Sequence, residues 1–127
     1  MIGSLPFILD LNFVFEGVLR LEDEELILEW RRVKSWPFKT YPPEQAHVPL
    51  SQLESIEFKS PIYLFHAMLR IRVRNMEALA QVPHSHGAEI TLYCKKKYRN
   101  LARDIANMAT FQKLAQVFPD HSSQTNI

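Results

Sequence analysis

The chain has 127 residues, of which 46% are hydrophobic and 23% are charged, and its formal net charge at pH 7 is +1. This length predicts one domain with a single sizeable core, and the near-neutral charge excludes a global attraction to nucleic acid or to an anionic membrane. Cys94 is the only cysteine, so no internal disulfide can form and nothing requires an oxidising compartment.

The first fifteen residues are apolar but lack the features of a secretory signal. They contain no basic leading segment, Pro6 interrupts them, and Asp10 and Asn12 fall where a signal would stay apolar. No apolar run along the chain reaches the roughly 18 residues that a membrane span needs. We therefore expect no transmembrane segment and a cytoplasmic location.

Residues 13–32 carry the alternating pattern of two β-strands joined by a tight turn. Apolar residues recur at every second position on both sides of the turn, a period that is typical of half-buried strands. Gly17 lies inside the first strand, where a glycine often marks a bulge or a bend. The side chains expected on the inner face are those of Phe13, Phe15, Leu19, Leu21, Leu26, Leu28 and Trp30.

The turn of this hairpin, Glu22 to Glu25, gathers four carboxylates. It lacks the glycine-bearing spacing of a calcium loop, and the pattern therefore favours a solvated tip over a metal site. Charged side chains at such a tip also oppose edge-to-edge pairing with another chain. We expect no metal here.

Residues 33–45 interrupt the strand pattern with three prolines, and Trp36, Phe38 and Tyr41 lie among them. A loop of this length in a small domain is often functional. Aromatic side chains are enriched where proteins bind one another, so we expect these three residues to contact a partner. The alternative, in which one or two of them fold back onto the core, stays open, above all for Trp36.

The remaining extended segments are shorter. Residues 47–60 predict an extended piece, a turn and a strand whose Ile56 and Phe58 face inward. Residues 75–83 are ambiguous and contain at most a helical turn. Residues 88–94 predict a last strand.

Residues 68–74 show the cleanest alternation in the chain, with Leu, Ile and Val on one face and three arginines on the other. The arginine face could accept an acidic segment or nucleic acid. Pairing with glutamates on neighbouring strands, such as Glu54 or Glu57, is the more frequent arrangement and the one we expect. The three residues are Arg70, Arg72 and Arg74.

Two histidines, His84 and His86, have the spacing of metal ligands on one strand face. Pro83 and Gly87 flank them and predict a turn instead, and no third ligand with suitable spacing is present in the sequence. A turn without a metal is therefore the expectation.

No constellation of residues in the sequence indicates catalysis. Cys94 falls on the inward side of its strand, which favours a buried thiol over a nucleophile. His47 and His66 stand alone, and hydrogen-bonded structural roles are expected for both. The sequence contains no glycine-rich phosphate loop and no recognisable nucleophile motif. We expect no enzyme activity and no cofactor.

After Cys94 the apolar period lengthens to three and four residues, which predicts an amphipathic helix of about five turns. Basic residues crowd its start, where the helix dipole disfavours positive charge. Such a cluster could bind phosphate or anionic lipid, although a solvated helix start is commoner. The basic residues are Lys95, Lys96, Lys97 and Arg99, and the apolar stripe consists of Tyr98, Leu101, Ala102, Ile105, Met108, Ala109 and Leu114.

Antiparallel strands followed by one amphipathic helix are also the order of the pleckstrin-homology-like superfamily, and the chain resembles its bacterial members. Their first hairpin is similar to FEGVLRLEDEELILEW in this chain. The start of a middle strand is similar to VPLSQLESIEF, and the last strand with the following helix is similar to ITLYCKKKYRNLARDIANMA. The resemblance implies a mainly β, α+β fold, an open barrel of two antiparallel sheets that the C-terminal helix caps. The runner-up is another α+β sheet with the helix across one face.

We accordingly expect one domain over residues 1–127, with a core at about 13–114 and a polar tail at 119–127. The resemblance also implies two kinds of ligand. Members that bind phosphoinositides use lysine and arginine around the first hairpin, whereas the acidic turn of this chain would repel a polyphosphate. Other members bind peptide or protein segments, often between a sheet edge and the helix.

The expected function is therefore that of a non-enzymatic binding or scaffolding module whose partner is a protein or peptide, a second copy of the chain included. The expected contact residues are Trp36, Phe38 and Tyr41. The alternative is peripheral binding to anionic membrane lipid through Lys95, Lys96, Lys97 and Arg99. Phosphoinositide at the first hairpin and nucleic acid are not expected as ligands.

Overall fold

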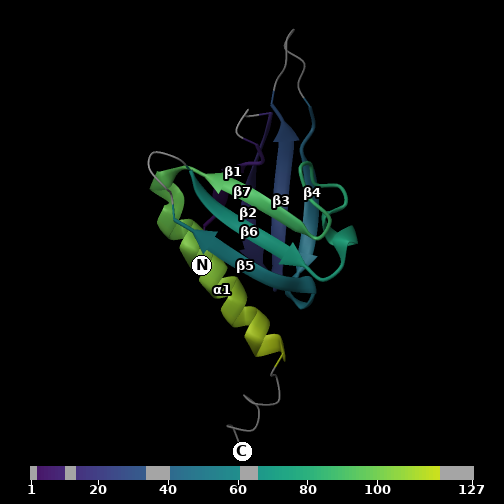
Figure 1. Ribbon diagram of the computed structural model, residues 1–127, viewed down its shortest axis with the longest axis vertical. Coiled ribbons are helices and arrows are strands. Elements are labelled where there is room, and N and C mark those ends of the chain that lie inside the picture. Colours follow the sequence, from purple (N-terminus) through teal and green to yellow (C-terminus); the bar gives the residue numbers. More distant parts are fainter. Residues whose placement is uncertain (1–2, 11–13, 34–40, 61–65, 118–127) are drawn as a thin grey trace, which may run out of the picture.

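Figure 1 shows the protein as a computed structural model that describes residues 3–10, 14–33, 41–60 and 66–117. Within these ranges the chain forms strands, three short 3-10 helical turns and a long α-helix. The strands are β1 (Leu5–Ile8), β2 (Phe15–Glu22), β3 (Glu25–Arg32), β4 (Glu44–Pro49), β5 (Leu53–Lys59), β6 (Ala67–Val73) and β7 (Glu89–Cys94), and the helical segments are η1 (Leu50–Gln52), η2 (Met76–Leu79), η3 (Lys96–Tyr98) and α1 (Arg99–Val117).

The strands form one antiparallel sheet in the order β4-β3-β2-β1-β7-β6-β5 (Figure 1). The sheet ends at β4 and β5 and is not closed into a barrel. The mainly β, α+β class is confirmed, but one sheet replaces the two that the sequence led us to expect. The cause is β1, which pairs along its length with β2 and, at Ile8, with Tyr93 of β7, so that it joins the two halves.

No strand is expected from the sequence before residue 13, yet β1 lies there and contributes to the core. Leu5, Phe7 and Leu9 are each no more than 3% exposed. The buried core therefore begins earlier along the chain than the pattern of alternation indicated. Phe13 itself lies outside the described residues.

The acidic hairpin is confirmed. Residues of β2 and β3 pair without a break from Phe15–Arg32 to Glu22–Glu25. Asp23 and Glu24 form the turn with φ angles of 49° and 62°, the left-handed values that a two-residue hairpin turn requires. The Glu22 carboxylate lies 3.1 Å from Arg20 Nε and the Glu25 carboxylate 2.9 Å from His47 Nδ1, so local partners hold two of the four carboxylates.

Gly17 produces no bulge, because its pairing with Phe7 on one side and Trp30 on the other is regular. Its role is steric. A Cβ atom at this position would lie 2.1 Å from the carbonyl oxygen of Glu29 and 2.9 Å from both Phe7 Cζ and Trp30 Cα. The absence of a side chain therefore allows the Phe7 ring to pack over β2.

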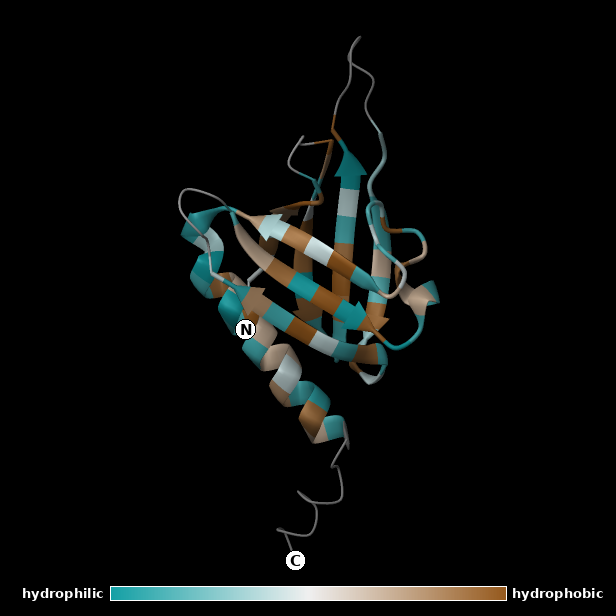
Figure 2. Cartoon of the chain, in the orientation of Figure 1, coloured by the Kyte–Doolittle hydropathy of each residue, from teal (hydrophilic) through white to brown (hydrophobic). Residues whose placement is uncertain are grey.

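Alternation along the later strands is confirmed, and Figure 2 shows apolar and polar bands succeeding each other along β6 and β7. Leu69, Ile71 and Val73 are buried on β6, as is Ile56 on β5, while Phe58 is half-buried. Residues 75–83 contain the 3-10 turn η2. The largest fully buried side chains are those of Trp30, Leu5, Leu19, Leu26, Leu28, Leu50, Leu53, Leu69, Ile71, Leu79, Ile90 and Leu92.

Helix α1 packs on the sheet with a narrower stripe than the sequence predicts. Its buried residues are Ala102, Ile105, Ala106 and Ala109. Met108 and Leu114 belong to the predicted stripe, but they are 40% and 51% exposed. Met108 adjoins the fully buried Ala109, so it lies at the border of the buried stripe, whereas the C-terminal end of the helix extends past the sheet (Figure 1). Within the described ranges, no helix is long and apolar enough to cross a membrane.

Candidate functional site

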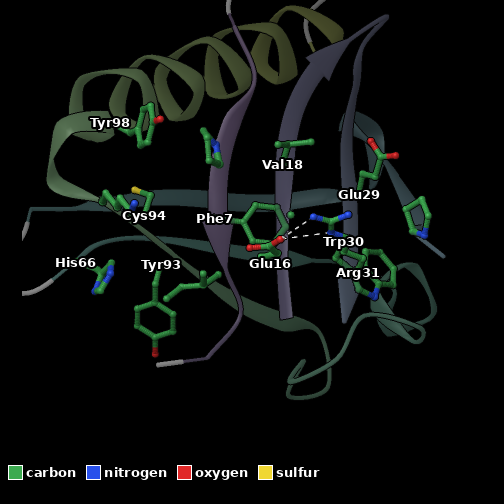
Figure 3. Close-up of a pocket in the computed structure, with 15 residues that line it drawn as sticks. Phe7, Glu16, Val18, Glu29, Trp30, Arg31, His66, Tyr93, Cys94 and Tyr98 are labelled. Carbon is green, nitrogen blue, oxygen red and sulfur yellow. Dashed lines mark hydrogen bonds and ion pairs between the residues drawn. The ribbon is translucent and has the colours of Figure 1, made fainter. Parts of the chain in front are cut away.

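A pocket of about 540 Å³ opens where the two halves of the sheet meet (Figure 3). Three consecutive residues from each of β1, β2 and β3 line it, at 6–8, 16–18 and 29–31. The hollow therefore runs across the strands at one level and forms a trough. The other lining residues are Pro43 at the β4 side and His66, Tyr93, Cys94, Lys95 and Tyr98 at the β7 side.

The pairing register explains the shape of the trough. In each triplet the middle residue, Phe7, Gly17 or Trp30, lies on the core side of the sheet, so its backbone forms the floor. The flanking residues point to the other face, because successive side chains of a strand alternate. One wall consists of Ile8, Glu16 and Arg31, and the other of Pro6, Val18 and Glu29.

The junction between β1 and β7 opens because neither strand can extend the pairing. The N–H of Leu9 donates to Phe15 O at 3.1 Å, so by alternation Ile8 and Pro6 direct their backbone groups toward β7. Pro6 has no N–H to give. On the other side β7 ends at Cys94, and the chain turns at Lys95 into η3. Among the described residues, β1 and β7 consequently pair at Ile8 and Tyr93 alone.

The charges in the trough are distributed unevenly. Arg31 donates from both Nε and Nη2 to Glu16, at 3.3 and 3.1 Å, as the dashed lines of Figure 3 mark. Glu29 lies 3.8 Å from Arg20, which neighbours the trough on β2. Lys95 is exposed, and no ion-pair partner for it occurs among the described residues. The β7 end is therefore positive, the β3 end is neutralised, and the centre is apolar.

Of the three aromatic residues in the loop at 33–45, the structure describes only Tyr41. Tyr41 is half-buried, and the guanidinium of Arg32 lies 5.4 Å from the centre of its ring. Trp36 and Phe38 lie outside the described residues, so their predicted contact with a partner stays a prediction. Pro43, two residues after Tyr41, lines the trough.

The basic residues before the helix lie at the opposite end of the trough. Lys95 precedes the 3-10 turn η3, Lys96 and Lys97 lie within that turn, and Arg99 is the first residue of α1. Lys95, Lys97 and Arg99 are exposed, whereas Lys96 is half-buried. The Lys97 ammonium lies 5.1 Å from the Tyr98 ring centre, and Arg99 donates to Lys96 O at 3.2 Å. Of the four, Lys95 alone lines the trough.

The histidines have neighbours typical of structural roles. His47 contacts Glu25 at 2.9 Å and Gln45 at 3.3 Å. His84 lies in a turn, as predicted, with a φ angle of 64° and its Nε2 2.9 Å from Asp10 Oδ2. Among the described residues, no three or more His, Cys, Asp or Glu side chains come together as a metal site would require.

Cys94 is buried, as expected, and burial raises the pKa of its thiol to about 11. Its Sγ lies 3.7 Å from Ala67 O, to which the thiol donates. Since the thiolate is the reactive form, about a thousandth of the thiol is ionised at pH 8. We expect iodoacetamide to alkylate the native protein far more slowly than the urea-unfolded protein, as mass spectrometry would show. Equal rates would contradict the burial of this thiol.

Arginines of β6 pair with a glutamate of the neighbouring strand, but that glutamate is Glu89 of β7 rather than Glu54 or Glu57. Arg72 Nη2 donates to Glu89 at 2.8 Å, and Arg70 Nε lies 3.9 Å from the same oxygen. Arg74 is exposed after the end of the strand. The predicted neutralisation of the arginine face is thus confirmed for two of its members.

The hydrogen bond from Arg72 lowers the pKa of Glu89 below its ordinary 4.5. A lowered carboxyl pKa stabilises the fold above the ordinary value, and that stabilisation is lost as the pH falls through the pKa of the folded state. We expect Glu89→Gln to lower the melting temperature slightly at pH 7, with the difference shrinking below pH 4.5. Melting curves across pH check this, and a difference that grows in acid would contradict it.

At the edge of the sheet beside the helix, where the pleckstrin-homology-like resemblance would place a peptide, two side chains of α1 contact β5. The guanidinium of Arg103 lies 5.1 Å from the ring centre of Phe58 on β5. Lys113 Nζ donates to the carbonyl oxygen of Glu54 on the same strand. These two contacts link α1 to β5 near both ends of the strand.

The trough was not predicted from the sequence, because its central strand, β1, was not. Residues 5–9 do alternate between the core and the outer face of the sheet. The outward residue Ile8 is as apolar as the buried Leu9 that follows it, however, so the sequence shows no period of two. Comparisons of the chain with protein-family models, with curated proteins and with solved structures gave no match. A function for this chain is therefore inferred from the geometry of its described residues.

Proposed function

We propose that this protein is a non-enzymatic binding module that holds a peptide segment of a partner protein in the trough. The observation that carries the proposal is the trough itself, an apolar centre of Pro6, Ile8 and Val18 on the outer face of the sheet. Tyr93 and Tyr98 stand at one end of it (Figure 3). Aromatic and aliphatic walls with a few charges at the rim are typical of sites that bind protein segments.

The direction of the trough supports a side-chain-driven mode of binding. It crosses β1, β2 and β3, so a bound segment would lie across the strands and could not add to the sheet as a further strand. From β7 to the start of β4 the span is about 19 Å, and an extended segment of about six residues fills it. The backbone of such a segment stays largely hydrated, and its side chains supply the contact.

The contacts of Arg103 and Lys113 support the choice of the trough over the space between β5 and α1. A peptide in that space would have to displace the Lys113 bond to Glu54 O and the Arg103 contact with Phe58. The trough requires no such displacement. The pleckstrin-homology-like resemblance agrees with a binding role in general, since members of that superfamily serve as ligand-binding modules.

The test is a selection of linear peptides of about twelve residues, displayed on phage, against the immobilised protein. We expect enriched peptides that bind in the micromolar range. Val18→Trp, which fills the centre of the trough, should weaken them at least about tenfold. Met76→Trp is the matched control, because it enlarges an apolar side chain that is 58% exposed elsewhere.

Two results would contradict the proposal. Equal binding by the Val18→Trp variant would show that the peptides do not bind in the trough. A selection that enriches no peptide would contradict the binding function itself. A melting curve of Val18→Trp accompanies the assay, since only a folded variant is informative.

Peripheral binding to anionic lipid is the second candidate, and the exposure of Lys95, Lys97 and Arg99 at one corner favours it. Sedimentation with neutral and with phosphatidylserine-containing vesicles separates the two. Binding to the anionic vesicles that weakens steeply with salt would support the lipid function. Absence of sedimentation at low salt would remove it.

A further inference from the structure

We infer that the trough selects a segment that combines two or three apolar side chains with an aspartate or glutamate, and that Lys95 is the residue that recognises the carboxylate. This inference rests on the proposed function and adds the chemistry of the ligand. Its basis is the order of apolar and charged residues along the trough, which differs between its two ends.

At the β3 end, the carboxylates and guanidiniums already satisfy one another. Glu16 accepts two hydrogen bonds from Arg31, and Glu29 has Arg20 at 3.8 Å. A ligand charge of either sign placed here would have to compete with these pairs. The β3 end therefore discriminates weakly and tolerates neutral polar residues.

At the β7 end, the exposed ammonium of Lys95 has no ion-pair partner among the described residues. Tyr93 and Tyr98 line the same end of the trough, and Figure 3 shows their rings extending in different directions. A cation next to an apolar wall matches a carboxylate that lies beside apolar side chains. A ligand lysine or arginine at this end would meet a like charge and is rejected.

The apolar centre fixes the rest of the motif. Ile8 and Val18 stand on opposite walls, with Pro6 beside Val18, and the backbone of Gly17 lies between them. This space accepts aliphatic or aromatic side chains. The order in the ligand is thus apolar residues over β1 and β2 and the acidic residue over the β1–β7 junction.

The same phage-displayed peptide library tests the inference with three baits: the native protein, Lys95→Glu and Arg74→Glu. Peptides selected on the native protein should be enriched in aspartate or glutamate beside apolar residues. On Lys95→Glu this enrichment should disappear or change to lysine and arginine. Arg74→Glu reverses one exposed charge outside the trough, and it should select the same peptides as the native protein.

A synthetic peptide from the native selection then gives the magnitude. We expect its dissociation constant to rise about fivefold on Lys95→Glu and to recover when its carboxylate is replaced by lysine. Peptides that are sensitive to Val18→Trp but show no acidic preference would overturn the inference and leave the binding function standing. If Val18→Trp weakens the binding of no peptide, the trough is not the binding site. The inference about Lys95 is then contradicted as well, because it depends on that site.

Discussion

Gly17→Ala should destabilise the protein by about 3 kcal/mol or more, although it adds a single methyl group. The new Cβ would lie 2.1 Å from the carbonyl oxygen of Glu29, a backbone atom that cannot move without shifting β3. The Phe7 ring, at 2.9 Å, would have to move as well. The gain from a stiffer unfolded chain, below about 1 kcal/mol, is too small to offset these clashes.

Urea denaturation measures the effect, with Gly3→Ala as the matched control. No atom lies within 4 Å of a Cβ built at Gly3, so we expect a change of less than about 1 kcal/mol there. A stable Gly17→Ala variant would mean that β1 does not pack over β2 as described. The floor of the trough would then have a different structure.

Phe7→Ala should cost about 3–5 kcal/mol, the range for removing a buried aromatic side chain. Phe7 is 3% exposed and lies on the core side of β1. Its neighbour Ile8 is only half-buried and points to the trough, so Ile8→Ala should cost about 1 kcal/mol. The pair compares the two faces of one short strand.

Thermal or urea unfolding of both variants checks this contrast. Equal costs for Phe7→Ala and Ile8→Ala would contradict the assignment of the two faces, and a small cost for both would contradict the burial of β1. Ile8→Ala also serves in binding assays, because it reduces the trough wall without emptying the core.

Much of the fold could be predicted where local pattern and burial agree. The β2–β3 hairpin has clear alternation and an acidic turn, and β6 alternates Leu, Ile and Val with arginine, so both were found. The helix was found, but the exposure of Met108 and Leu114 depends on how the helix lies on the sheet, and periodicity does not contain that information. β1 was missed because apolar residues occur on both of its faces.

The candidate site could be predicted only in part, because it depends on long-range pairing. Lys95 was identified as a basic residue before the helix, but its place in one trough with Pro6 and Val18 results from the approach of β1 to β7. Residues such as Val18 and Tyr93 carry no motif. Their significance arises from the register between strands that are distant in the sequence.

The most direct test of the proposed site is an amide NMR titration of the native protein with a peptide from the phage selection. We predict that shift changes cluster at residues 6–8, 16–18, 29–31 and 93–98, which line or adjoin the trough. Changes that cluster instead on β5 and on the facing side of α1 would contradict the proposed site. Such a result would place the ligand between the sheet edge and the helix, where Arg103 and Lys113 now lie.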